Sequence, residues 1–159
     1  MYKRIISVLL AGFMCVAAFA QTKSKTTIAP FKITLVDGKT YTYNQLTKNK
    51  PVVLVYFSPT CEHCQVFTQA MLKRRKELAN MQIVMISYLP LNDVKKFDET
   101  YHLSSNPNIK VGTEGYTFIV QKYYNVQRFP FVVEYNKEGK LSKVVPYNSK
   151  NPEEMAAQL

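Results

Sequence analysis

Two almost wholly apolar runs stand out in the pattern of hydrophobic and polar residues along the chain. They occupy residues 51–57 (PVVLVYF) and 82–88 (QIVMISY) and are rich in β-branched side chains. Runs of this kind are typical of strands that are buried on both faces of a parallel sheet. Between them, residues 62–80 repeat apolar side chains at helical spacing, with basic residues in the intervals, which predicts a helix. The three segments together predict a βαβ unit with a right-handed crossover.

Alternating polar and apolar residues predict two hairpins, one near each end of the chain. Residues 31–35 (FKITL) and 39–43 (KTYTY) flank an Asp-Gly pair, which favours a tight two-residue turn. Residues 131–135 (FVVEY) and 140–145 (KLSKVV) flank the turn sequence Asn-Lys-Glu-Gly. We therefore expect each of these two pairs of segments to form antiparallel strands.

The remaining segments are predicted as short helices and one loop. Residues 104–115 contain Asn-Pro and two glycines, which predicts a loop. The last helix has a strong start signal, because Asn151 can cap it and Pro152 is followed by two acidic residues. A helix over residues 92–101 is expected to be capped by Asn92. The other helical segments expected are 44–48, 116–125 and 152–159.

The order of these elements predicts an α/β protein. A βαβ unit contains parallel strands, whereas the last two strands form a hairpin, so we expect a mixed sheet with helices on both faces. The predicted architecture is a three-layer α/β/α sandwich with a mixed central sheet and an N-terminal β-hairpin extension. The chain has 159 residues, of which 47% are hydrophobic and 20% charged, as expected for one globular domain.

Residues 1–20 have the pattern of a secretory signal peptide. A short basic start is followed by an apolar stretch and by an Ala-Phe-Ala sequence that ends at Ala20. A retained membrane anchor is the alternative, but the apolar stretch is short for a span, which needs roughly 20 residues. We expect cleavage after Ala20, a flexible leader over residues 21–29, a folded domain over residues 30–159, and a periplasmic or otherwise exported location.

The charge of the chain is basic but not concentrated in one stripe. The formal net charge of +10 becomes +8 when Lys3 and Arg4 leave with the signal peptide. Export argues against nucleic acid as a partner. A solvated basic surface explains the excess, and attraction to an acidic partner or an anionic membrane surface is the alternative. We expect a monomer.

Two cysteines remain after export, because Cys15 would leave with the signal peptide. Cys61 and Cys64 form a C-x-x-C pair at the predicted junction of a buried strand and a helix. A helix N-terminus stabilises an anion, and the thiolate is the reactive form of cysteine. We therefore predict that Cys61 attacks a disulfide and that the more buried Cys64 resolves the mixed disulfide. Glu62 and His63, between the cysteines, are predicted to tune the reduction potential in opposite directions.

Three other interpretations of the cysteine pair compete with thiol–disulfide exchange. A structural zinc site needs four ligands, and the chain offers one cysteine pair with the two histidines His63 and His102. A copper site is an alternative, because soft thiolates suit Cu(I). A purely structural disulfide across so short a loop would stabilise the fold little. Exchange chemistry is the favoured interpretation.

Two stretches resemble the exported TlpA/ResA-like thiol–disulfide oxidoreductases, which have the thioredoxin fold. They are FKITLVDGKTYTYNQLTKNKPVVLVYFSPTCEHC and YYNVQRFPFVVEYNKEGKLSKVV. The resemblance implies a thioredoxin-like sandwich, catalytic residues Cys61 and Cys64, and a cis peptide bond before Pro130. It also implies that the Phe129 backbone pairs with an extended substrate. The implied partners are protein thiols or disulfides of the cell envelope and a membrane electron donor, with no diffusible cofactor and a reducing role.

The sequence also departs from the thioredoxin pattern. Thioredoxins carry an acidic residue six positions before the first cysteine, and here that position is Val55. Glu134 is a candidate substitute proton acceptor, and a solvent-facing glutamate is the alternative. Gln69 stands where the active-site helix often has a kinking proline, and the chain has no tryptophan. The competing functional hypothesis is a thioredoxin-fold binding module that holds copper or a partner protein without turnover.

Overall fold

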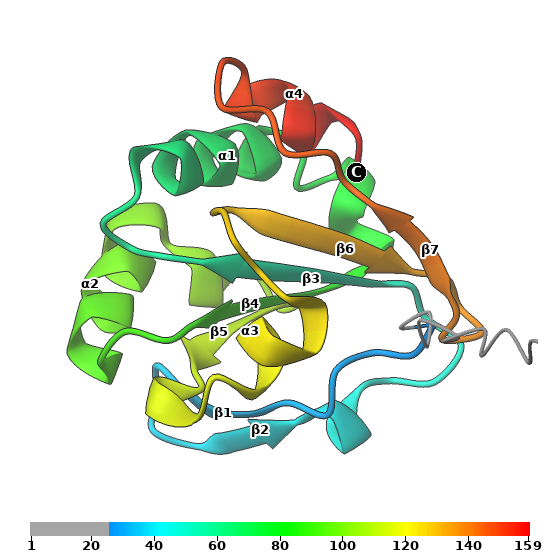
Figure 1. The fold of residues 1–159 in the computed structure, drawn as a ribbon, viewed down its shortest axis with the longest axis horizontal. Coiled ribbons are helices and arrows are strands. Elements are labelled where there is room, and N and C mark those ends of the chain that lie inside the picture. Colours follow the sequence, from blue (N-terminus) through cyan, green and yellow to red (C-terminus); the bar gives the residue numbers. More distant parts are fainter. Residues whose placement is uncertain (1–25) are drawn as a thin grey trace, which may run out of the picture.

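The computed structural model describes residues 26–159, in which seven strands form one mixed sheet (Figure 1). The strands follow one another across the sheet in the order β2-β1-β5-β4-β3-β6-β7. β4 pairs in parallel with both β3 and β5, and the other neighbouring strands are antiparallel. The strands are β1 (Lys32–Leu35), β2 (Thr40–Thr42), β3 (Val52–Phe57), β4 (Gln82–Ser87), β5 (Ile109–Thr113), β6 (Phe131–Tyr135) and β7 (Leu141–Val144).

Helices cover both faces of this sheet. Figure 1 shows α1 and α4 side by side on one face and α3 on the other. Buried side chains of α1, α2 and α4 share one core with the sheet, and α3 contributes to the other core. The α-helices are α1 (Glu62–Lys73), α2 (Leu91–Tyr101), α3 (Ile119–Tyr124) and α4 (Pro152–Ala157), and the 3₁₀ helices are η1 (Tyr43–Gln45), η2 (Glu77–Asn80), η3 (Leu103–Ser105) and η4 (Gly115–Thr117). The predicted three-layer α/β/α sandwich is confirmed.

The burial of the central strand β3 on both faces explains its apolar sequence. All six of its residues are buried, and successive side chains of a strand point to opposite faces of a sheet. Val53 and Val55 therefore lie in the core beneath α1, whereas Leu54 and Tyr56 lie in the core on the α3 side. Because β3 is fixed on both faces, the turn that follows Phe57 is held firmly at the carboxyl end of the sheet.

The prediction of a loop over residues 104–115 is wrong for the second half of this segment, which forms the strand β5. Ile109 and Val111 are buried, and β5 pairs with β4 on one side and β1 on the other. The isolated segment is short and is interrupted by Lys110 and Gly112, so its sequence pattern is weak. Pairing on both sides supplies the stabilisation that the local pattern does not show.

Several helix boundaries also differ from the prediction. The helix predicted over residues 62–80 ends at Lys73, and a turn and η2 follow, so that Leu78 is buried. α2 begins at Leu91, with Pro90 rather than Asn92 at the capping position. The ψ angle of Pro90 (147°) lies outside the helical region, so α2 begins directly after Pro90 and before the predicted cap Asn92. The two predicted hairpins are confirmed.

The ordered domain begins before residue 30. Ala29, which the prediction assigns to the leader, is buried, and its N–H donates to the Tyr124 hydroxyl at 2.9 Å. Hydrogen bonds to tyrosine hydroxyls thus hold the end of the predicted leader against the domain. The predicted signal peptide over residues 1–20 lies outside the described residues. In the part of the chain that the structure describes, the helices are too short or too polar to span a bilayer.

Candidate active site

Cys61 occupies the turn between β3 and α1. Its N–H donates to the Ser58 carbonyl at 3.1 Å, and its own carbonyl accepts from the N–H groups of Cys64 at 3.0 Å and Gln65 at 3.1 Å. Cys61 is thus the residue that precedes the first turn of α1, with extended backbone angles (φ −87°, ψ 118°). The N–H groups of that turn have no helical partners and favour a negative charge nearby. The partly exposed Cys61 therefore lies next to these unpaired N–H groups at the start of α1.

Cys64 lies one turn further along α1 and is fully buried, in the same core as Phe67 and Met71. Burial raises the pKa of the Cys64 thiol above its ordinary value, whereas a hydrogen bond with the Ser58 backbone lowers it. The neighbouring Cys61 also raises the pKa of Cys64. Both cysteines are free thiols. One exposed and one buried sulfur on the same helical turn fit the predicted roles of nucleophile and resolving cysteine.

The peptide bond between Phe129 and Pro130 is cis, as the family resemblance implies. This peptide lies against the cysteine pair, because the Cys61 thiol donates to the Phe129 carbonyl with an S···O distance of 3.7 Å. Pro130 is buried and Phe129 is partly exposed. The structure therefore brings the two predicted cysteines together with Phe129 and Pro130, which lie more than 60 positions further along the chain.

His63 has a neighbour that the sequence pattern did not reveal. The Tyr147 hydroxyl lies 3.3 Å from His63 Nδ1, and the two rings meet edge to face. The guanidinium carbon of Arg128 lies 5.5 Å from the centre of the Tyr147 ring. Tyr147 thus joins His63 of the cysteine turn to Arg128 of the segment that leads to Pro130. Glu62, in contrast, is exposed in the first turn of α1.

The structure places an aliphatic side chain, and no acid, at the position of the thioredoxin aspartate. Val55 is fully buried and lies opposite Val132 of β6. The candidate substitute Glu134 lies opposite Val53 instead and forms an ion pair with Lys143 at 3.4 Å. Its side chain is 13% exposed, so it is neither a free surface glutamate nor a partner of Cys64. On α1, one turn beyond Cys64, the buried Thr68 hydroxyl has no hydrogen-bond partner among the described residues.

A buried carboxylate supports the opposite side of the cis-proline turn. Glu114 is 5% exposed and accepts a hydrogen bond from the Tyr56 hydroxyl at 2.7 Å. The Tyr56 ring in turn packs against the Phe129 ring, with centroids 5.9 Å apart. Neither Tyr56 nor Glu114 carries a motif, and the only sequence signal was a glutamate in a segment predicted as a loop.

The described residues contain no group of three or more His, Cys, Asp and Glu side chains that could hold a metal ion. His102 ends α2 in a left-handed conformation and does not join such a group with the cysteines. A zinc site would need four ligands, so the residues present do not fit one. Two thiols alone still suit Cu(I).

A family model described as thioredoxin-like matches residues 49–141. The match spans more than half of the chain and includes both cysteines and Pro130. The chain therefore belongs to the thioredoxin-like family, which confirms the family predicted from the sequence. No curated protein sequence matches the chain.

Solved structures that are similar to this one include three thiol–disulfide proteins. A secreted disulfide oxidoreductase of Mycobacterium tuberculosis, homologous to E. coli DsbE, is 20% identical, with a TM-score of 0.63 over 82% of this chain and 96% of its own. The thioredoxin domain of a thiol-disulfide oxidoreductase of Bacteroides vulgatus is 18% identical (TM-score 0.65, 84% and 96% covered). A thiol:disulfide interchange protein of Chlorobium tepidum is 20% identical (TM-score 0.62, 84% and 94% covered). Likeness at these identities establishes the fold.

Proposed function

We propose that this chain is an exported thiol–disulfide oxidoreductase that exchanges disulfides with protein partners and acts as a reductant. One observation carries the proposal: the Cys61 sulfur lies at the N-terminus of α1, in contact with the carbonyl before the cis bond to Pro130. The buried Cys64 lies one turn behind it. Together these groups provide a nucleophile, a backbone edge that can hold an extended partner, and a second thiol that can release it.

The exchange has two steps. The Cys61 thiolate attacks one sulfur of a partner disulfide, a Cys61–partner disulfide forms, and the other partner sulfur leaves as a thiolate. Cys64 then attacks the Cys61 sulfur, the internal disulfide forms, and the remaining partner sulfur leaves. Two electrons pass from the cysteine pair to the partner. Cys64 loses its proton when it attacks, and the departing partner sulfur takes up a proton, so the number of protons is conserved.

The location and the electron source rest on the sequence. The signal-peptide pattern of residues 1–20 supports export, and one similar structure is of a secreted protein. In this proposal a membrane protein of the cell envelope reduces the Cys61–Cys64 disulfide after each turnover. The cysteine pair itself carries the electrons, so no diffusible cofactor takes part. In this proposal the protein acts as a monomer.

The reduction potential of the cysteine pair tests this function. The purified protein is equilibrated in glutathione and dithiothreitol buffers, and the fraction of disulfide is measured by thiol alkylation. A potential at or below roughly −270 mV supports a reductant, and a value near roughly −120 mV would make the protein a disulfide donor instead. A Cys64→Ser variant is the control, because it cannot form the internal disulfide.

The redox measurement and a Cu(I) titration, both on the purified protein, distinguish disulfide exchange from the binding-module alternative. If no reversible two-electron couple exists, the oxidoreductase proposal fails. A Cu(I) titration then asks whether the two thiols bind one ion and whether Cys61→Ser abolishes that binding. Stoichiometric binding without disulfide reductase activity would favour the copper module.

A further inference from the structure

A run of aromatic rings leads away from the Cys61 site across the molecule. The Phe129 ring lies 5.8 Å from the Tyr88 ring, Tyr88 lies 6.0 Å from Phe118, and Phe118 lies 6.2 Å from Tyr116, all between centroids. Tyr116 is 76% exposed, and Tyr88 and Phe118 are partly exposed. We call Tyr88, Phe118 and Tyr116 the aromatic platform. Its first ring, Tyr88, packs against Phe129, whose carbonyl contacts Cys61.

The platform is held in a defined conformation. Phe118 has a left-handed backbone (φ +52°), which is uncommon and costly for a bulky residue. Glu114 stabilises the turn, because its buried carboxylate accepts from the Val120 N–H at 2.9 Å and its carbonyl accepts from the Thr117 hydroxyl at 3.0 Å. Backbone strain that buried hydrogen bonds maintain is a feature of functional surfaces. These hydrogen bonds therefore hold the exposed rings in fixed positions on the surface.

The ring spacing suits an extended polypeptide. A strand rises about 3.3 Å per residue, and alternate side chains point to the same side, so these side chains are roughly 6.6 Å apart. Neighbouring rings between Phe129 and Tyr116 are 5.8 to 6.2 Å apart. The separations of successive rings are thus close to the spacing of alternate side chains in one extended segment. Ile119, next to Phe118 and 40% exposed, widens the apolar surface.

The charge in contact with the platform is positive. Lys122 lies 5.9 Å from the Phe118 ring centre, whereas Arg128 lies over the Tyr147 ring, next to His63. Both side chains are exposed, and within residues 26–159 neither forms an ion pair with an acidic residue. A hollow of about 330 Å³ is lined in part by Phe118 and Lys122 and by Gln127 of the segment that leads to Pro130. This arrangement complements an acidic side chain of a partner.

We propose that the aromatic platform binds the substrate protein next to its reacting cysteine. The bound segment is extended, carries apolar side chains at alternate positions, and has an acidic residue that reaches Lys122. This inference rests on the proposed exchange function and names the class of protein substrate that the site accepts. Each apolar side chain that the platform covers adds to the attraction through buried apolar area.

The test uses peptides whose single cysteine is bound to 5-thio-2-nitrobenzoate, which is released as a coloured thiolate when Cys61 attacks. One peptide has leucine at alternate positions and a glutamate, the second has serine in place of leucine, and the third has lysine in place of glutamate. Ellman's reagent, a small disulfide without a peptide, reports the intrinsic reactivity of Cys61. Rates are measured with the reduced wild-type protein and with Tyr116→Ser, Lys122→Glu and Tyr43→Ser variants. Tyr43 is the matched control, because it is also an exposed tyrosine (38%) but lies in η1.

We expect the wild-type protein to prefer the leucine–glutamate peptide over the serine peptide roughly tenfold, which corresponds to about 1.4 kcal/mol. Tyr116→Ser should remove most of this preference, and Lys122→Glu should shift it towards the lysine peptide. All variants should keep the wild-type rate with Ellman's reagent within about twofold, and Tyr43→Ser should keep the peptide preference as well.

Equal rates with all peptides, or an unchanged preference in both platform variants, would overturn the platform while the exchange function stands. A preference that Tyr43→Ser also removes would overturn it too, because the effect would then not be specific to the platform. If the wild-type protein fails to react even with Ellman's reagent, the exchange function itself fails, and the platform proposal fails with it.

Discussion

At the scale of single residues, Cys61 and Cys64 differ in environment although one helical turn carries both. Cys61 lies at the start of α1 and is partly exposed, whereas Cys64 is buried in the core beneath that helix. Burial raises the pKa of Cys64 because a thiolate loses solvation in an apolar surrounding. This difference in exposure sets the order of the two proposed attacks, because Cys61 is accessible to a partner and Cys64 is not.

Alkylation of Cys64 should show this effect directly. Cys64 stays buried in a Cys61→Ser variant, so we expect its pKa to stay raised. The thiol should then remain protonated at about pH 8.5, where an ordinary cysteine ionises. We expect the rate of reaction with iodoacetamide to keep rising above about pH 9. The same variant unfolded in urea should reach its plateau near the ordinary pKa. A plateau at that pH in the folded protein would contradict the prediction.

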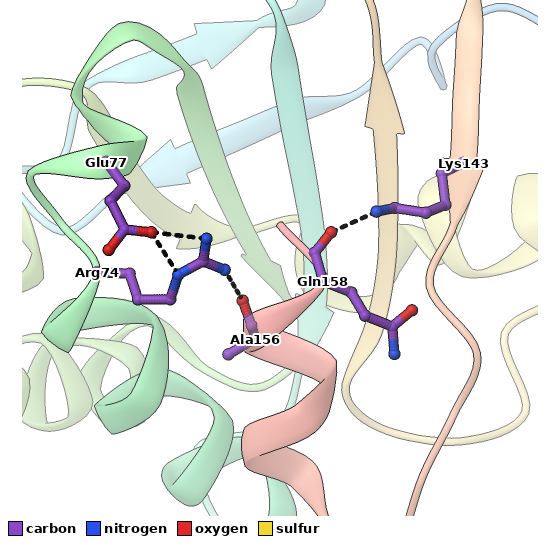
Figure 2. Close-up of polar contacts among 5 residues, drawn as sticks. All are labelled: Arg74, Glu77, Lys143, Ala156 and Gln158. Atoms are coloured by element: carbon purple, nitrogen blue, oxygen red, sulfur yellow. Dashed lines mark hydrogen bonds and ion pairs between the residues drawn. The ribbon is translucent and has the colours of Figure 1, made fainter.

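At the scale of elements, α1 is held in place by the C-terminal helix as well as by the sheet. Figure 2 shows Arg74, just after α1, reaching the end of α4. Its guanidinium group donates to the Ala156 carbonyl at 2.7 Å and to Glu77 at 2.8 Å. Lys143 of β7 donates to the Gln158 carbonyl near the same helix end. Cations suit the C-terminus of a helix, whose carbonyls have no helical partners.

Removal of the Arg74 side chain should therefore loosen α4. We expect Arg74→Ala to lower the free energy of unfolding by about 1.5–3 kcal/mol, the usual range for a hydrogen bond to a charged group. The matched control is Arg75→Ala, because Arg75 is exposed and makes only a 3.5 Å contact with the Leu72 carbonyl. The control should change stability by less than about 0.5 kcal/mol. Urea unfolding measures both, and equal losses would contradict a specific role for Arg74.

The N-terminal hairpin pairs with the rest of the sheet where β1 lies beside Gly112 of β5. A methyl group added to Gly112 of β5 would lie 2.4 Å from the Thr34 carbonyl oxygen of β1. We expect Gly112→Ala to destabilise the protein by about 1–3 kcal/mol and to speed hydrogen exchange of the β1 amides. In Gly139→Ala, the added group meets no atom within 4 Å, and the strain comes instead from the positive φ (+72°) in the turn between β6 and β7. That variant should keep the protection of β1, and faster exchange there would show that the effect is not local to Gly112.

Prediction from the sequence succeeded where local signals were strong. The apolar run of β3, the hairpin turns and the spacing of Cys61 and Cys64 each carry their own pattern, and the structure agrees with them. β5 was missed because its stability comes from strands on both sides rather than from its own sequence. Tyr147 and Glu114 were missed for a related reason. Each acts through a contact with a residue more than 50 positions away, and no local pattern reports such a contact.

At the scale of the whole molecule, tyrosine hydroxyls tie together distant parts of the chain. Tyr124 of α3 and Tyr135 of β6 share a hydrogen bond of 2.6 Å. Tyr135 also donates to the Thr27 carbonyl at 3.0 Å, and Tyr124 accepts from the Ala29 N–H at 2.9 Å. Burial raises the pKa of Tyr124 and raises that of Tyr135 to about 12. The folded protein thus requires both phenols to remain neutral.

Stability should consequently fall in alkaline solution. The folded-state pKa values are raised above the unfolded value of about 10, so their contribution is complete below about pH 10. It is lost as the pH rises from about 10 through the folded-state values, at up to about 1.4 kcal/mol per pH unit for each tyrosine. We expect Tyr124→Phe to weaken this dependence when urea unfolding is measured between about pH 8 and 11, whereas Tyr43→Phe should retain it. Lysine deprotonation affects all variants alike, so the difference between the two reports the buried Tyr124–Tyr135 pair. Identical pH profiles for both variants would show that Tyr124 does not link the folding of the domain to its ionisation.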